Sequence, residues 1–381
     1  MLDLELRQSC VNTIRFLAAD AVEKAKSGHP GAPMGMADMA FVLWNQFLRY
    51  DPDDPQWPNR DRFVLSAGHA SMLLYSLLHL AGYKLTMEDI QNFRQWKSLT
   101  PGHPEYGLTP GVECTTGPLG SGFSNAAGMA LGAKMMAARF NSSKDTLIDS
   151  RIFVLCSDGD MQEGIASETA SLAGHLGLGN LIALYDSNDI TIAGDAGLAM
   201  SEDVGRRFEA YGWHVQHCDG HNHDKIAVCL EEALRVPMKP SLIVAKTIIG
   251  KGAPTKEGTA GSHGAPLGAD EIRSAKQALG WEEKPDFYVP DEVREVFEER
   301  KKNLKLQHQE WEKRLTNWKK SNPELAELWD SHWDKKLPDN LLNQLIETID
   351  GEEDATRNLS GKVIQKMAEL IPSLVGGSAD L

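Results

Sequence analysis

The sequence predicts an α/β protein built on a doubly wound, mainly parallel sheet flanked by helices. Five short runs rich in aliphatic residues recur along the chain without polar alternation, as in strands buried on both faces. Helix-like segments separate these runs, which favours parallel strands joined by helical crossovers. The predicted strands are residues 63–66, 151–156, 180–186, 213–218 and 241–249.

The first element of this fold is expected to be a helix over residues 4–26. Its apolar residues recur near helical spacing, and Gly28 interrupts the pattern. The following segment, SGHPGAPMG, contains two prolines and three glycines and is predicted to be a loop.

The C-terminal third of the sequence changes character. Residues 291–320 predict a long amphipathic helix ended by Pro323, either a connector packed on its neighbours or a short coiled coil. A polar linker follows, and the last residues predict a helix and a strand that open a second α/β domain. The expected organisation is a complete domain over 1–290, a helical linker over 291–355 and an incomplete domain over 356–381.

Composition excludes several classes of function. With 39 Lys and Arg against 54 Asp and Glu, the net charge is −15, which argues against nucleic acid as a partner. No apolar run reaches the roughly 18–20 residues of a membrane span, and the first residues lack the pattern of a signal peptide. Five cysteines without a CxxC pair indicate reduced thiols and a cytoplasmic location.

Polar residues after two predicted strands suggest a metal site. Asp158 and Gly159 follow one buried strand, and Asn188 ends the next, at the sheet edge where α/β proteins bind ligands. With the carbonyl of Ile190 these residues offer hard oxygen donors for Mg²⁺ and a diphosphate. The alternative is structural: Asp158 caps a helix and Asn188 serves a turn.

A glycine-rich turn is a second candidate. Gly117, Gly120 and Gly122 precede a predicted helix, where free backbone N–H groups suit a phosphate. Such turns also occur for structural reasons alone.

Four histidines in predicted loops form a third candidate site. Each is flanked by glycine, and neutral imidazoles can donate hydrogen bonds to hydroxyls and shuttle protons. Separate surface or structural roles are the alternative. The four are His29, His69, His103 and His263.

The DGHNHD segment carries two further histidines, His221 and His223, that could mimic a metal pair. We interpret this segment as a solvated loop.

Taken in order, many segments resemble the transketolase family of thiamine diphosphate enzymes. The resemblance covers essentially the whole chain, but only the first of three family domains, the linker and the opening of the second domain. The matching segments are SGHPGAPMGMAD, DRFVLSAGHASMLLYSLLHL, TPGHPEYG, TTGPLG, RFEAYGWHV, KTIIGKGAP, SHGAPLG and GGSADL.

The resemblance implies a two-carbon ketol transfer in the pentose phosphate pathway. A ketose phosphate such as xylulose 5-phosphate would be the donor and an aldose phosphate the acceptor, with thiamine diphosphate and Mg²⁺ or Ca²⁺ as cofactors. The family's sites form in a dimer, so the partner would be a second copy or a polypeptide carrying the remaining domains. The glutamate that protonates the cofactor's aminopyrimidine would lie in those domains, so this chain alone is expected to be inactive.

The resemblance also assigns cofactor residues. Asp158, Asn188 and the carbonyl of Ile190 would hold the metal. Glu163 and Glu168 would join a carboxylate network between two active sites. The other residues expected to contact thiamine diphosphate are His69, Gly117, Leu119, Gly159, Ile192, Ile249, His263 and Asp380.

Substrate contacts follow from the same resemblance. Arg94 and Arg357 would meet the sugar phosphate, and Glu163 is included among the catalytic groups. The residues expected to bind the donor's oxygens and assist proton transfer are His29, His69, His103 and His263.

Five positions depart from the family pattern. Three are Ser157 for a usual glycine, Ser121 for a usual glutamine, and Ala260 for a usual histidine. The other two, Asp160 and Asp189, are expected to add negative charge beside the metal.

Two alternatives stay open. The chain could be a non-catalytic half that dimerises and binds only metal-diphosphate. It could instead belong to a dihydroxyacetone synthase-like transferase. The GHP segments and SHGAPLG favour transketolase over deoxyxylulose-phosphate synthase.

Overall fold

The computed structural model describes residues 2–335 and 337–377. The chain divides into two compact units, Met1–Glu312 and Lys313–Leu381. The boundary falls inside the long helix α11 (Asp291–Ser321). The two units are described separately below.

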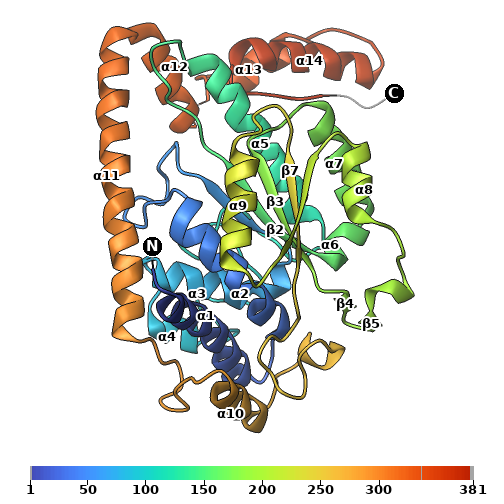
Figure 1. Cartoon of the computed structure of the whole chain (residues 1–381). Coiled ribbons are helices and arrows are strands. Elements are labelled where there is room, and N and C mark those ends of the chain that lie inside the picture. Colours follow the sequence, from blue (N-terminus) through green and yellow to red (C-terminus); the bar gives the residue numbers. More distant parts are fainter. Residues whose placement is uncertain (1, 336, 378–381) are drawn as a thin grey trace. The chain divides into compact units, whose positions relative to one another are not determined.

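A five-stranded parallel sheet forms the centre of the first unit (Figure 1). The parallel α/β fold predicted from the sequence is therefore confirmed. The last predicted strand ends early, so residues 247–249 leave the sheet as a loop. In spatial order the strands are β1 (Arg62–Leu65), β2 (Ile152–Ser157), β3 (Leu181–Ser187), β7 (Ser241–Lys246) and β6 (His214–Asp219).

Helices cover both faces of the sheet, because successive strand residues point to opposite sides. In β2, Phe153 and Leu155 join one core, whereas Ile152 and Val154 join the other. The helices that pack in the first core are α1 (Leu4–Ala25), α2 (Gly31–Val42), α3 (Ser71–Leu80) and α9 (His223–Leu234). Those of the second are α5 (Ser121–Phe140), α7 (Gly164–His175) and α8 (Val204–Ala210).

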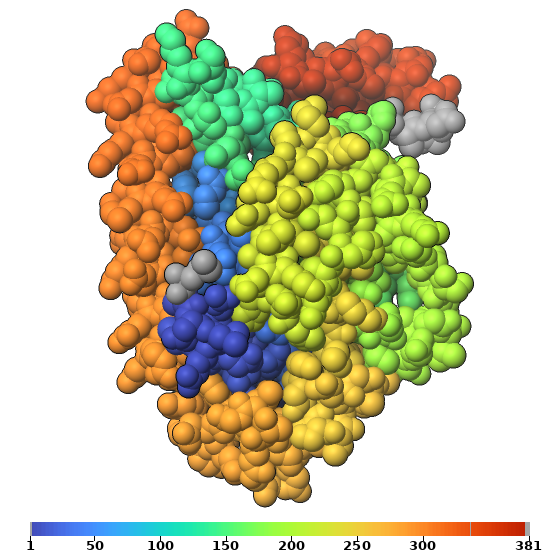
Figure 2. All heavy atoms as spheres, in the orientation of Figure 1, coloured from blue at the N-terminus to red at the C-terminus, as the bar shows by residue number. Residues whose placement is uncertain are grey.

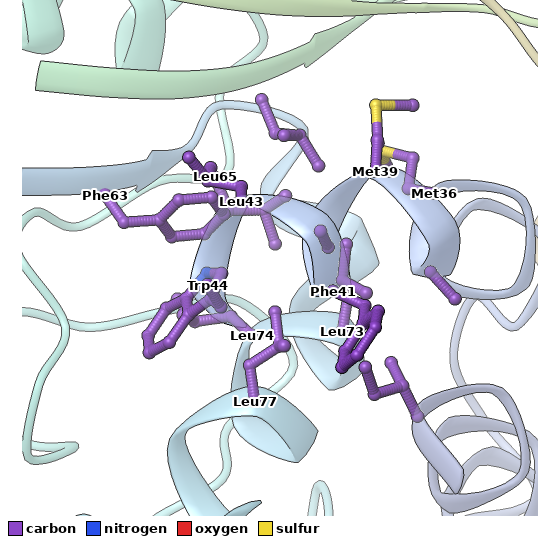
Figure 3. Packing of buried hydrophobic residues seen from close by; sticks show 14 of the residues in the cluster. Met36, Met39, Phe41, Leu43, Trp44, Phe63, Leu65, Leu73, Leu74 and Leu77 are labelled. Carbon is purple, nitrogen blue, oxygen red and sulfur yellow. The ribbon is translucent and has the colours of Figure 1, made fainter. Parts of the chain in front are cut away.

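Within the first core, residues of α2 and α3 pack against β1. Figure 3 shows Phe41 and Trp44 packed among Leu73, Leu74 and Leu77, with Phe63 of β1 beside Trp44. All six are at most 5% exposed. This packing holds α2 against the sheet and so fixes the loop that precedes it.

Shorter elements complete the first unit. Several of them lie in the connections that follow β1, β2 and β3. They are α4 (Met87–Gln91), α6 (Asp158–Gln162), α10 (Ala269–Ala278), the hairpin β4 (Ile190–Thr191) and β5 (Gly194–Asp195), a π-helical turn at Leu43–Phe47, and 3₁₀ turns at Gly68–Ala70, Ala196–Leu198 and Ala260–Ser262.

The loop predicted for SGHPGAPMG is wrong in its second half. Residues 31–35 form the first turns of α2, and only 27–30 are loop. Pro33 lies in the first turn, where backbone N–H groups have no intrahelical partner, so the helix tolerates it.

The long helix predicted over 291–320 is confirmed as α11. Val293, Phe297 and Leu304 are buried in the same core as α1 and α3, which makes this part of α11 a packed connector rather than a free coiled coil. Figure 2 shows the side chains of this half of α11, in orange, seated against blue N-terminal segments of the unit. Nowhere in residues 2–335 and 337–377 does a helix have both the length and the apolar character needed to cross a bilayer.

The described part of the second unit is helical. It contains the end of α11 followed by α12 (Pro323–Trp333), α13 (Leu341–Glu347) and α14 (Thr356–Leu370). The strand predicted after α14 is wrong as far as the structure describes it, since residues 371–377 are irregular. A strand needs a hydrogen-bonded neighbour, and the described residues of this unit provide none.

Candidate active site

A cavity of about 470 Å³ lies at the carboxyl ends of β1, β2, β3 and β7. This is the edge at which open α/β sheets bind ligands, and the volume is in the usual range for small-molecule sites. Its walls come from the loops after these strands, the loop between α1 and α2, and the glycine-rich turn before α5. The lining residues are His29, Ala32, His69, His103, Gly117, Leu119, Ser157, Gly159, Gln162, Glu163, Asn188, Ile190, Thr191, Ile192, Ile249 and His263.

Most of the site residues expected from the sequence line this cavity. Asp158 lines a neighbouring cavity of about 320 Å³. Arg94 lines another of about 800 Å³, which His103 shares with the first. Glu168 is exposed on α7, Arg357 belongs to the second unit, and Asp380 lies outside the described residues.

Three of the four loop histidines form a compact cluster. The ring centroids of His29 and His69 are 5.0 Å apart, those of His69 and His263 5.2 Å, and those of His29 and His263 5.6 Å. His103 lines the same cavity but is exposed. Gly28 allows the chain to place His29 here, because its φ is +137° and a Cβ would lie 2.8 Å from the Phe93 ring.

The clustered imidazoles are neutral at neutral pH. Burial, together with the neighbouring imidazoles, lowers the pKa of His29 to about 4 and that of His69 to about 3. Burial also lowers the pKa of His263 and His103. The buried Nδ1 atoms of His29 and His263 have no hydrogen-bond partner in the described chain, so a polar ligand in the cavity would satisfy them.

Asp158 begins α6 directly after β2, and its carboxylate is held from two sides. Its Oδ1 accepts a hydrogen bond from the Tyr185 hydroxyl at 2.5 Å. Its Oδ2 accepts from the backbone N–H groups of Asn188 at 3.2 Å and Asp189 at 3.0 Å. Burial raises the pKa of Asp158 despite these hydrogen bonds. Carboxylate oxygens have further lone pairs, so this group remains able to ligate a cation.

Asn188 is oriented by its neighbours after β3. Its amide nitrogen donates to Asp186 at 2.7 Å, and its Oδ1 accepts from the N–H of Ile190 at 2.9 Å. The second contact is the turn role that the sequence also allowed. Thr247 donates a further hydrogen bond to Asp186, and burial raises the pKa of Asp186 to about 7.

Sequence reasoning missed three residues that support this site: Tyr185, Asp186 and Thr247. Tyr185 and Asp186 come from the interior of a predicted strand, where the sequence gives no sign of which side chain reaches a neighbouring strand end. Within the described residues, no group of three or more His, Cys, Asp or Glu gathers as a metal site. A cation here would therefore depend on amide and carbonyl oxygens beside the carboxylate of Asp158.

Comparison with known proteins identifies the family. A family model described as "Transketolase, thiamine diphosphate binding domain" matches residues 6–338. The chain belongs to the transketolase family. Transketolase from Halalkalibacterium halodurans is 51% identical over 377 residues, covering 99% of this chain and 56% of the relative. The chain thus spans a little over half the length of the curated transketolases that it matches.

Solved transketolase structures share the fold. The Pichia stipitis enzyme in complex with sedoheptulose 7-phosphate superposes with a TM-score of 0.95 at 44% identity, covering 98% of this chain and 56% of that one. The Leishmania mexicana enzyme gives a TM-score of 0.93 at 41% identity, with coverages of 98% and 56%. The cavity therefore lies in a fold shared along nearly the whole chain.

The carboxylate of Asp160 has a structural role in the glycine-rich turn. The Asp160 side chain is fully buried and accepts hydrogen bonds from Ser66 Oγ at 2.6 Å and from the N–H of Gly120 at 2.8 Å. The N–H of Ser157 donates to the same carboxylate at 3.0 Å. Asp160 therefore fastens the glycine-rich turn to the ends of β1 and β2.

The carboxylate of Asp189 lies close enough to Asp158 for its negative charge to help raise the pKa of Asp158. It forms an ion pair with Lys246 at the exposed end of β7. The other departures from the family pattern have local contacts: Ser121 Oγ donates to the carbonyl of Pro118 at 2.6 Å, and the carbonyl of Ala260 accepts from the N–H of His263 at 3.0 Å.

The interpretation of DGHNHD as a solvated loop is also wrong. His223 is buried at the start of α9, and His221 is partly buried. Both imidazoles bond to Asp38 of α2, each at 2.8 Å. A buried carboxylate more than 180 residues away in sequence therefore organises this segment, and no local pattern indicated it.

Proposed function

We propose that this chain is the cofactor-binding part of a transketolase. Its reaction would move a two-carbon ketol unit from a ketose phosphate, such as xylulose 5-phosphate, to an aldose phosphate. The observation that carries the proposal is the convergence of the motif residues of at least six loops on one cavity, in a chain that the transketolase family model matches over residues 6–338.

The residues proposed to bind the cofactor line this cavity or the neighbouring one. Asp158, Asn188 and the carbonyl of Ile190 would hold Mg²⁺ or Ca²⁺ with a diphosphate. Apolar side chains at Leu119 and Ile249 line the same cavity and suit a ring system. Thiamine diphosphate, when bound, supplies the electron sink for cleavage of a carbon–carbon bond. The other proposed cofactor contacts are His69, Gly117, Gly159, Ile192 and His263.

The histidine cluster would handle the substrate's hydroxyl groups. A neutral imidazole has one N–H donor and one nitrogen acceptor, so it can orient a hydroxyl and hold or return its proton. His29 and His263 have free buried Nδ1 atoms for this purpose. Arg94, which lines the same cavity as His103, is proposed to bind the sugar phosphate, and Arg357 is proposed as a further phosphate contact. The Pichia stipitis structures with xylulose 5-phosphate and sedoheptulose 7-phosphate support this class of substrate.

We also propose that the chain acts in a dimer in the cytoplasm. The outer faces of α5 and α7 carry exposed apolar side chains: Ile165 is 45% exposed, Leu172 55%, Leu176 40% and Met135 39%. Glu168 lies on the same face of α7, where a carboxylate shared between two sites would be placed. Such a face on neighbouring helices favours burial against a second copy. Leu172→Asp should shift the sedimentation coefficient to that of a monomer, and an unchanged dimer would contradict this interface.

Titration calorimetry with thiamine diphosphate and Mg²⁺ tests cofactor binding. The chain should bind both together, and Asp158→Ala should weaken binding at least about tenfold because the carboxylate of the proposed metal site is lost. Asp270→Ala is the matched control, since the Asp270 side chain is 96% exposed on α10. Equal binding by both variants would refute the assigned metal site.

Turnover requires the rest of a transketolase, since the chain covers 56% of its curated relative. The chain, supplied with the remaining domains and cofactors, should convert xylulose 5-phosphate and ribose 5-phosphate to products. Cofactor binding without any turnover in that assembly would instead favour a non-catalytic half. Transfer to formaldehyde in preference to aldose phosphates would favour a dihydroxyacetone synthase-like enzyme.

A further inference from the structure

A buried polar network lies behind the wall of the cavity. Asp38 of α2 is 3% exposed and accepts hydrogen bonds from Arg15 of α1 and from His221 and His223. Burial opposes ionisation of this carboxylate, but the two histidines and the charge of Arg15 hold its pKa well below the usual range. Asp38 therefore stays an acceptor at neutral pH.

This network fixes the hydrogen-bonding state of His221. Nδ1 lies 2.8 Å from Asp38 Oδ2, so it carries the proton and donates to the carboxylate. Nε2 is then an acceptor, and the N–H of Ile248 donates to it at 3.0 Å. His221 thus connects a buried carboxylate to the backbone of the loop after β7.

That loop forms part of the cavity wall. Ile249 is 1% exposed and lines the cavity. The loop also rests directly on α2: the N–H of Gly250 donates to the carbonyl of Gly31 at 2.9 Å. A Cβ at Gly35 would lie 2.9 Å from the carbonyl oxygen of Ile248, so α2 and the loop meet backbone to backbone.

We propose that His221 is a positioning residue of the cofactor site, holding Ile249 at the cavity wall through the N–H of Ile248. That Ile249 belongs to a cofactor site rests on the proposed function, whereas the restraint of the loop by His221 does not. His223 offers an internal comparison, because it donates to the same carboxylate but has no hydrogen bond to the loop in the described structure. If the network only stabilised the fold, substituting either histidine would have the same effect on the loop after β7.

Hydrogen exchange of the unliganded chain tests the restraint itself. His221→Phe keeps a planar ring but removes the acceptor, so amides 247–250 should exchange roughly tenfold faster, the factor expected for one lost hydrogen bond. His223→Phe should leave these amides within about twofold of the wild type. His221→Gln should restore most of the protection, because an amide carries both a donor and an acceptor. Equal exchange in both Phe variants would overturn the proposal.

Cofactor affinity tests the consequence for the site. His221→Phe should raise the dissociation constant for thiamine diphosphate with Mg²⁺ by about tenfold, and His223→Phe by less than about threefold. If the wild type fails to bind the cofactor, the proposed function fails while the exchange result still decides the restraint. If exchange changes as expected but affinity does not, His221 holds the loop without positioning the site, and the proposal is wrong. If either Phe variant fails to fold, the same comparison between His221→Ala, His221→Gln and His223→Gln decides it.

Discussion

The hydroxyl of Tyr185, in β3, lies 2.5 Å from Oδ1 of Asp158, which directly follows the adjacent strand β2. Tyr185 is the residue of β3 that pairs with Cys156 of β2, two positions before Asp158. The parallel register therefore brings a phenol from the body of one strand to the carboxylate that follows its neighbour. This contact orients the candidate metal ligand before any ligand arrives.

Removing this hydroxyl should weaken cofactor binding more than it weakens the fold. Tyr185→Phe leaves Asp158 free to rotate, so the dissociation constant for thiamine diphosphate with Mg²⁺ should rise by about tenfold, as for other residues that orient metal ligands. Calorimetry measures the affinity. Tyr50→Phe is the control, because the Tyr50 hydroxyl is buried without a partner in the described chain and should be lost without cost. Unchanged affinity of the Tyr185 variant would contradict the orienting role.

Asp160 should contribute strongly to stability. Asp160→Ala leaves the Ser66 hydroxyl and the N–H groups of Gly120 and Ser157 without their acceptor inside the protein. We expect a loss of about 3 kcal/mol in the free energy of unfolding, measured by urea denaturation. Asp224→Ala, which removes an 81% exposed partner of Arg7, should cost less than about 1 kcal/mol. Similar losses for both variants would exclude an anchoring role for Asp160.

The buried histidines should make the fold sensitive to acid. Burial lowers the pKa of His69 to about 3, so below its ordinary value of about 6.5 the unfolded chain takes up a proton that the folded chain does not. Stability should therefore fall as the pH falls through that range. Between pH 7 and pH 5 the wild type should lose about 2 kcal/mol relative to His69→Gln, by urea unfolding at each pH. The same substitution at exposed His175 is the control, and parallel curves for wild type and His69→Gln would contradict the expectation.

Gly120 should be intolerant of any side chain. Its φ is +76°, and a Cβ would lie 2.9 Å from Ile165 Cγ2. Gly120→Ala should therefore cost about 1–2 kcal/mol for the left-handed backbone and roughly 1 kcal/mol more for the contact with α7. Gly212→Ala isolates the first effect, because Gly212 has a φ of +87° and open space around it. Thermal unfolding of the two variants compares them, and equal melting temperatures would show that the contact costs nothing.

Much of the first unit was predictable because its signals are local. The strands β1, β2, β3 and β7 are short unalternating apolar runs, and their alternate residues enter two cores as expected for a sheet buried on both faces. The edge strand β6 is more polar and only partly buried. The positions of Asp158, Asn188 and the four histidines were predictable as well, since glycine-rich loops and strand ends define where side chains approach the sheet edge. The family resemblance then related these segments to one another.

The remaining features depend on contacts that no local pattern contains. Asp160 has the same sequence context as a metal-site carboxylate, and only the approach of Ser66 and Gly120 shows that it binds the glycine-rich turn. His221 and His223 look solvated until Asp38 of a distant helix is placed beside them. Pro33 led to the incorrect prediction of a loop at the start of α2, because a proline breaks a helix in its middle but is accepted in its first turn.

The backbone contact between α2 and the loop after β7 has an evolutionary consequence. Gly31 and Gly35 have no room for a methyl group, since a Cβ would lie 2.5 Å from the carbonyl of Ser262 at the first and 2.9 Å from that of Ile248 at the second. More than two hundred residues separate the two sides of this contact in the sequence. A substitution at one side can be accepted only together with a compensating backbone change at the other. The sequences of the two segments should therefore change together among descendants of this chain.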